Sequence, residues 1–280
     1  MVIKRKLKSC LAVGLAYVCT GLALIFLGSI LWTLIKNGMA GLSWQLFSQS
    51  TPGPGTEGGG LLNAMVGTVM MTSVGIAVGT PVGILAGTWL ANAAPRSKLA
   101  QLIRFLNDIL LSAPSILIGL FIYQMLVVTM GHFSGWAGAM ALAMIALPVV
   151  VRTTEDMLRL VPAQLKEAAA SLGMAQWHIT VAICYRAAAM GMLTGLLLAI
   201  ARISGETAPL LFTALNNQFF SMDMNGPLAN LPVTIYRFAM SPDSHWNQLA
   251  WSGALLITFS ILMLNLLARQ LLRWRQQGTR

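Results

Sequence analysis

Two side chains of opposite charge interrupt an otherwise uncharged apolar segment in the last third of the sequence. Arg202 and Glu206 are four residues apart, so in a helix they would share one face. A guanidinium offers planar, bidentate hydrogen bonds to an oxyanion, and the nearby carboxylate could orient it and keep the anion from binding too tightly to leave. The same pair could instead be a structural ion pair that holds a helix bundle in register. Pro209 is expected to end this helix.

Arg152 is the second residue that could contact an anion. It follows the apolar run Val149-Val150-Val151 at the end of another uncharged segment. One interpretation is an anchor that extends its charge toward water while its stem stays in apolar surroundings. The other is a residue that receives an anion at the mouth of a path. Asp108 and Glu155 are expected to be solvated or to act as salt-bridge partners.

The segments that carry these residues are those of a membrane protein. Of 280 residues, 56% are hydrophobic and only 9% are charged, whereas ordinary globular chains are about 25% charged. This composition excludes a soluble globule and a disordered chain. A span takes ~20 apolar residues, and within lipid a helix satisfies its own backbone. We predict an all-α integral membrane protein, a single domain of residues 1–280, with six transmembrane helices at about 11–35, 63–91, 111–130, 135–151, 187–208 and 249–268.

The second predicted span has a pattern of small residues that is typical of helix packing in lipid. Its glycines let a neighbouring helix approach closely; they are Gly67, Gly75, Gly79, Gly83 and Gly87. Pro81 is expected to kink the same helix. A turn at Gly131 to Gly135 separates the third and fourth spans.

The positive charges indicate how the chain is oriented. With a cytoplasmic N-terminus, 15 of the 18 Lys and Arg residues lie inside, as the positive-inside rule requires, and both termini are cytoplasmic. Arg202 then lies toward the outside and Arg152 toward the inside, so the two would form a two-station anion path. The net charge of +10 fits a basic fringe against anionic membrane lipid, and we expect no nucleic-acid partner. The three histidines lack metal-ligand spacing, so no metal site is expected, and the three cysteines are interpreted as small helix-packing residues without a disulfide framework.

Residues 152–186 are predicted to form a cytoplasmic loop that docks a partner. Pro162 falls in the first turn of a short helix and Gly173 just past its end, which is the usual asymmetry of a capped helix. A second helical stretch is predicted at about 175–182. Two short amphipathic helices between two spans favour a docking surface.

This loop resembles the cytoplasmic motif of ATP-binding-cassette importer permeases. The similarity rests on Glu167-Ala168-Ala169, on Gly173 and on Ile183 ten residues later. In that family the loop is a coupling helix that sits in a cleft of the ATPase subunit, which implies the same role for these residues. The family pattern continues with Leu-Pro, whereas this sequence has Tyr185 and Arg186.

Four further blocks are similar to the A-type permease subunit of phosphate-specific importers. They are Leu110 to Ile116, Gly205 to Leu211, Asn230 to Ile235 and Glu57 to Gly60. The resemblance implies a bacterial inner-membrane permease for inorganic phosphate. It also implies a heterodimer with a second permease subunit, two cytoplasmic ATPase subunits and an extracytoplasmic phosphate-binding protein.

The sequence contains no phosphate-binding loop of the form G-x-x-x-x-G-K-[ST]. We therefore expect no enzymatic activity and no cofactor in this chain, with ATP bound and hydrolysed by a partner subunit. Two alternatives remain open. An arginine would serve another oxyanion such as sulfate equally well, and a proton-coupled secondary transporter could also use an Arg–Glu pair within a span.

Overall fold

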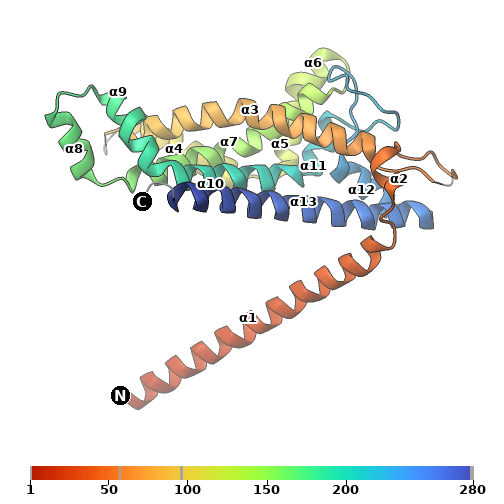
Figure 1. The fold of residues 1–280 in the computed structure, drawn as a ribbon, viewed down its shortest axis with the longest axis horizontal. Coiled ribbons are helices and arrows are strands. Elements are labelled where there is room, and N and C mark those ends of the chain that lie inside the picture. Colours follow the sequence, from red (N-terminus) through yellow and green to blue (C-terminus); the bar gives the residue numbers. More distant parts are fainter. Residues whose placement is uncertain (1, 57, 95–96, 278–280) are drawn as a thin grey trace.

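The fold is built around two long helices that lie side by side, α3 (Leu62–Asn92) and α7 (Gly135–Arg159). The computed structural model describes residues 2–56, 58–94 and 97–277, so Glu57, Arg96 and Arg280 lie outside the described residues. In the described part, every regular element is helical (Figure 1). Five helices are long and apolar enough to cross a membrane, or six if one bent pair counts as a single span. The predicted all-α membrane fold is confirmed.

Glycines of α3 make its close contact with α7. Gly75, Gly79, Gly83 and Gly87 are buried at four-residue spacing. A Cβ added at Gly79 would lie 3.0 Å from the carbonyl oxygen of Ala143, and one at Gly87 would lie 2.6 Å from that of Val151. Larger side chains would therefore push the two helices apart, so these glycines form the packing face that their spacing predicts. Helix α3 continues without a break through Pro81.

The remaining long helices overlap the predicted spans, with shifted ends. Helix α1 (Val2–Met39) covers 11–35, and α13 (Ser244–Gln277) covers 249–268. Helix α7 begins at Gly135 as predicted but runs through Pro148 as far as Arg159, so the first eight residues of the predicted docking loop are helical continuation. The segment from Gln176 to Ser204 is one long apolar unit made of α9 (Gln176–Ile179), a π-helical turn (Thr180–Cys184) and α10 (Tyr185–Ser204).

The third predicted span, 111–130, is not one straight helix. Helix α4 (Lys98–Ser112) ends before Pro114, and a second helical unit follows as α5 (Ser115–Ile122), a π-helical turn (Tyr123–Val127) and α6 (Val128–Met130). The two units meet at 105°. The cause is local: a residue before proline is driven out of the helical region, and Ala113 has φ −66° and ψ 135°.

The fifth predicted span, 187–208, also ends earlier than expected. Helix α10 stops at Ser204, and Gly205 caps it with φ −104° and ψ 3°. Pro209 lies in the first turn of a new short helix, α11 (Ala208–Thr213), where proline is well tolerated. Proline therefore starts a helix here, and the glycine before it marks where the preceding helix ends.

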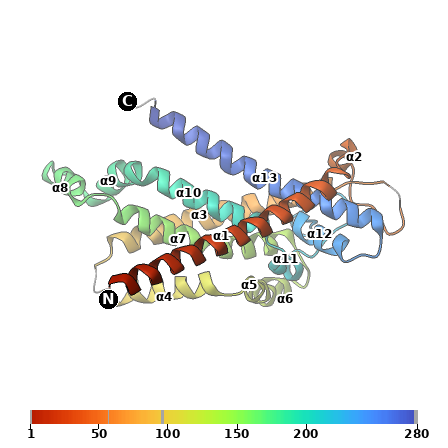
Figure 2. The same ribbon diagram turned by 90° about the horizontal axis from the view of Figure 1, so that it is seen from below.

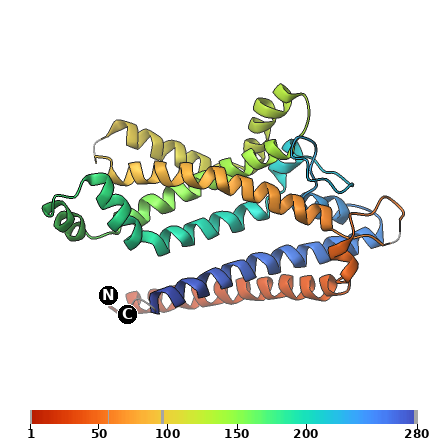
Figure 3. The ribbon, with the colours of Figure 1, turned by 45° about the horizontal axis from the view of Figure 1, so that its top comes forward.

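The short elements gather at the two ends of the bundle. Helices α2 (Trp44–Ser48) and α12 (Leu231–Ala239) lie at one end. Helix α8 (Ala163–Ser171), α9, the first turns of α1 and the last turns of α13 lie at the other (Figures 1 and 3). At the α2 end, buried Asn63 donates from Nδ2 to Oγ1 of Thr51 at 3.0 Å and to the carbonyl oxygen of Asn217 at 2.9 Å. These bonds hold two loops against the start of α3.

Helix α1 extends away from the other helices. Figures 1 and 2 show that it meets the bundle at its C-terminal end, alongside α13. There the hydroxyl of Ser252 donates to the carbonyl oxygen of Gly38 at 3.0 Å. A Cβ at Gly38 would lie 2.7 Å from the Cβ of Leu255, so glycine permits this close approach.

Candidate functional site

Arg202 and Glu206 do not share a helix face in the structure. Arg202 is in the last turn of α10 and is exposed, whereas Glu206 lies beyond the end of that helix and is partly buried. In the described part of the chain, no ion pair joins the two side chains. The expected i, i+4 arrangement is therefore wrong, because Gly205 ends the helix between them. The structural ion pair considered from the sequence loses its geometric basis.

The segments that follow two of the helix breaks pack against each other, close in sequence to Glu206. Helix α5 follows the break at Pro114, and α11 follows the break at Gly205. A Cβ added at Gly119 of α5 would lie 2.5 Å from Cα of Pro209 in α11. Helices α5 and α11 are therefore in close contact. Glu206 lies three residues before Pro209 in the sequence, and so close to this contact.

Arg152 is placed on α7 between two carboxylates. Its Nε lies 3.1 Å from Oδ2 of Asp156, one turn further along the helix, and its Nη1 lies 3.7 Å from Oδ1 of Asp108 on α4. All three side chains are about half exposed, so each pair contributes little to stability. Arg152 therefore keeps access to solvent while its charge is matched locally. Asp108 is the salt-bridge partner that the sequence allowed.

Glu155 is a buried charged residue whose burial the sequence did not predict. It is only 3% exposed, and its Oε1 accepts a hydrogen bond from Arg104 Nε and forms an ion pair with Arg159 Nη2, both at 2.7 Å. The expectation of a solvated carboxylate is wrong, and that of a salt-bridge partner is confirmed. The spacing of Glu155 and Arg159 was visible in the sequence. Arg104 lies 51 residues away, so no local pattern could reveal it.

Helix α8 ends at Gly173 as its sequence predicts. Gly173 has φ +79°, the left-handed conformation that glycine adopts without strain. Its N–H donates to the carbonyl oxygen of Ala170 at 2.9 Å, and the N–H of Met174 donates to that of Ala169 at 3.2 Å. This pair of bonds is the Schellman ending, which satisfies the last carbonyl groups of a helix and reverses the chain.

The residues of the predicted coupling motif divide into an inner and an outer set. Ala169 is buried against Leu158 and Ile179, and Ile183 packs against the same cluster. Glu167, Ala168 and Gly173 are exposed. The α8 and α9 region also exposes large apolar side chains, among them Leu165, Leu172 and Trp177. Exposed apolar surface is typical of sites that contact other proteins or a membrane.

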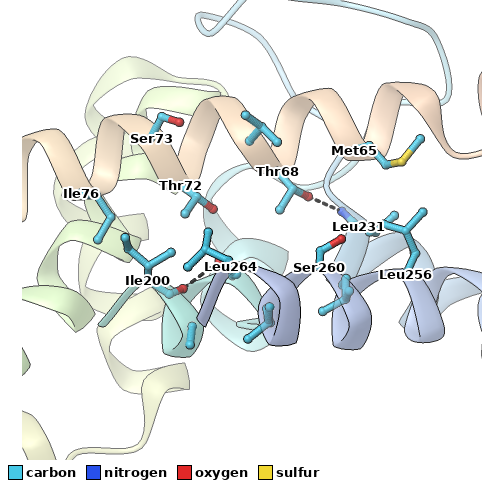
Figure 4. A pocket seen from close by; sticks show the side chains of 15 residues that line it. Met65, Thr68, Thr72, Ser73, Ile76, Ile200, Leu231, Leu256, Ser260 and Leu264 are labelled. Atoms are coloured by element: carbon cyan, nitrogen blue, oxygen red, sulfur yellow. Dashed lines mark hydrogen bonds between the residues drawn. The ribbon is translucent and has the colours of Figure 1, made fainter. Parts of the chain in front are cut away.

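A cavity of about 480 Å³ lies between α3, α10 and α13 (Figure 4). Its walls are largely apolar, with hydroxyl groups from Thr68, Thr72, Ser73, Ser204 and Ser260. Thr68 accepts a hydrogen bond through its Oγ1 from the backbone N–H of Leu231 at 2.7 Å. No ionisable residue lines this cavity, and neither Arg202 nor Glu206 is part of it. It is therefore not the predicted anion site.

The titratable side chains give no sign of a metal centre. Within the described residues, no group of three or more His, Cys, Asp or Glu side chains could hold an ion. The three cysteines are unpaired: Cys10 and Cys19 are exposed on α1, and Cys184 is buried in the cluster below α8.

Comparison with known proteins gives concordant matches. Residues 79–280 match the family described as "Binding-protein-dependent transport system inner membrane component". The chain is 60% identical to the phosphate transport system permease protein PstA of Pasteurella multocida, over 95% of this chain and 94% of that protein. It is 58% identical to the protein of the same name from Haemophilus influenzae, with the same coverage.

Two solved structures have a similar fold. The inward-facing MetNI methionine ABC transporter matches with a TM-score of 0.61 and 18% identity, over 74% of this chain and 92% of that chain. A bacterial ABC transporter that imports the acidic polysaccharide alginate matches with a TM-score of 0.61 and 14% identity, over 90% and 94%. At these identities the likeness concerns the fold alone.

Proposed function

The chain belongs to the family of binding-protein-dependent transport system inner membrane components, and we propose that it is the permease subunit of an ATP-driven importer of inorganic phosphate. The observation that carries this proposal is the 60% identity, over 95% of the chain, to a phosphate transport system permease. The importer works in the bacterial inner membrane, and this subunit has its termini in the cytoplasm. It supplies part of the path and no enzymatic step.

The partners follow from the division of labour in such an importer. The sequence has no phosphate-binding loop for ATP, so ATP is bound by two cytoplasmic ATPase subunits. A second, homologous permease completes the membrane unit as a heterodimer, and an extracytoplasmic phosphate-binding protein delivers the substrate. No cofactor is needed in this chain.

Helices α8 and α9 form the surface that receives the ATPase. Their exposed Leu172 and Trp177 supply an apolar outer face, and the exposed Glu167, Ala168 and Gly173 lie beside it. The inner face of α8, through Ala169, and Ile183 in the π-helical turn after α9 pack in one cluster with the end of α7 and the start of α10. Closure of the ATPase subunits thus moves the ends of two membrane helices, as alternating access requires. An exposed docking surface of this kind has no use in a secondary transporter.

Arg202 is the residue that meets phosphate toward the outside. It is exposed at the end of α10, and among the described residues no carboxylate pairs with it. Its guanidinium can offer two parallel hydrogen bonds to a phosphate oxyanion. Glu206, four residues on and outside the helix, repels the anion and favours its release. Arg152 at the other end of the bundle receives phosphate where Asp108 and Asp156 already offset part of its charge.

The test is uptake of labelled phosphate by cells that lack this gene, with and without the gene restored. We expect ATP-dependent uptake only when the chain is present. A tenfold excess of unlabelled phosphate should abolish the signal, whereas sulfate or molybdate at the same excess should not. Uptake that is independent of the chain, or that sulfate abolishes equally, would contradict the proposal.

A further inference from the structure

The end of α7 nearest α8 carries a buried carboxylate that the proposed phosphate path does not use. Oε1 of Glu155 accepts a hydrogen bond from Nε of Arg104 on α4 and forms an ion pair with Nη2 of Arg159, both at 2.7 Å, and the carboxylate side chain is 3% exposed. A second nitrogen of Arg104, Nη2, donates to the carbonyl oxygen of Leu90 at 3.0 Å. Glu155 and Arg104 therefore join α7, α4 and the last turn of α3 at one point.

The docking helices pack on α7 directly beyond this point. Leu158 and Val161, which follow Glu155 by less than two turns, are buried in one cluster with Ala169 of α8 and Ile179 of α9. Close-packed interiors transmit displacement because they have little free volume. A movement of α8 and α9 is therefore passed to the end of α7, where Glu155 is anchored.

Helix α4 depends on few contacts for its position against α7. Its buried residues are Ala100 and Asn107, and Asn107 donates from Nδ2 to the carbonyl oxygen of Pro148 at 3.2 Å. The pair between Asp108 and Arg152 is half exposed and weak. A buried carboxylate between two guanidinium groups is different, because removing one charge leaves the others unmatched. The contact of Arg104 with Glu155 is thus the strongest polar restraint on α4.

We propose that Glu155 is a positioning residue for transport, which passes movement of the docking helices to α4. Helix α4 continues through the bend at Pro114 into α5, and Gly119 of α5 lies against Pro209 of α11. Helix α11 begins two residues after Glu206. The helices α7, α4, α5 and α11 are therefore in contact one after another, from the ATPase-binding surface to the outer part of the phosphate path. Glu155 itself does not touch phosphate.

This inference rests on the proposed function, and the experiment separates the two. The complete complex, with second permease, ATPase and binding protein, is reconstituted in vesicles, and phosphate transported per ATP hydrolysed is measured. The unaltered complex tests the proposed function. Glu155→Gln tests the inference, because the amide keeps the size and an acceptor oxygen but loses the charge. We expect ATP hydrolysis to continue while phosphate transported per ATP falls at least tenfold.

Three further variants decide between positioning and simple loss of stability. Arg104→Gln should lower the ratio to a similar extent, and the double variant should be no worse than either single one, since residues that act through one contact are not additive. Asp223→Asn, which changes an exposed carboxylate to which no role in the path is assigned, should keep the ratio within twofold of the unaltered complex. If Glu155→Gln lowers transport and ATP hydrolysis in parallel, in proportion to the amount of assembled complex, the inference is overturned. An unchanged ratio in Glu155→Gln overturns it equally.

Discussion

Gly119 and Pro209 come from segments 90 residues apart and touch where both segments have just been interrupted, with a Cβ at Gly119 placed only 2.5 Å from Cα of Pro209. Neither side chain carries charge, yet their contact fixes how the segment after Pro114 lies against the one that begins next to Glu206. Backbone cannot yield as a flexible side chain can. The contact therefore determines how α5 lies against α11.

The first prediction concerns this contact. Gly119→Ala should force α5 away from α11 and destabilise the protein by about 1–3 kcal/mol, the usual cost of overpacking. Thermal stability of the purified protein and phosphate uptake should both fall. Gly21→Ala is the matched control, because it is also a helical glycine but has no atom within 4 Å of the added Cβ. Equal behaviour of the two variants would show that the close contact is unimportant.

The second prediction concerns the end of α8. Gly173→Trp should leave the protein in the membrane but prevent copurification of the ATPase and abolish uptake. The added ring would project from an exposed position into the docking face, and φ +79° disfavours any side chain except asparagine or aspartate. Gly173→Asn keeps this conformation accessible and should retain most of the activity. Normal copurification with tryptophan would remove Gly173 from the docking surface.

The third prediction concerns topology. A reporter that is active only in the cytoplasm should work when it is fused near Ser171 or after Arg280. It should fail near Gly55 or near Asn225, because α8 and the loops that carry these two residues lie at opposite ends of the bundle (Figure 1). An active cytoplasmic reporter at Asn225 would reverse the assignment of α10.

The fourth prediction concerns Arg202. Arg202→Gln should lower phosphate uptake about 10- to 100-fold with protein level and ATPase assembly unchanged, which corresponds to roughly 1.5–3 kcal/mol for lost charged hydrogen bonds. Arg202→Lys should recover only part of the activity, since an ammonium group lacks the bidentate geometry. Adding Glu206→Gln to Arg202→Gln should restore nothing, because the two side chains are not paired. Full uptake in that double variant would refute a role of Arg202 in phosphate binding.

Local patterns predicted the features that depend on neighbours in sequence. Gly173 ends α8 because a short helix after Pro162 needs a residue that accepts positive φ, and four-residue glycine spacing in α3 can only serve a close neighbour. The 105° bend and the early end of α10 were missed, although Pro114 and Gly205 mark both places. The length of an apolar segment does not show whether its helix is bent or straight.

Contacts between distant segments could not be predicted from the sequence, for a different reason. The hydrogen bond between Arg104 and Glu155 joins residues that are 51 positions apart. From the sequence, this carboxylate could equally have paired with an arginine or faced solvent. Burial of Glu155 arises only when α3, α4 and α7 converge. A charge that looks like part of a solvated loop can thus become the centre of a packed junction.

The attachment of α1 has a consequence for how the protein is made. The hydrogen bond between Ser252 and Gly38 joins the end of the first helix to the last helix, across 214 residues of chain. When α1 leaves the ribosome, its docking site does not yet exist. The first helix can therefore form this attachment only after α13 has been synthesised, and until then it lies in the bilayer without this partner.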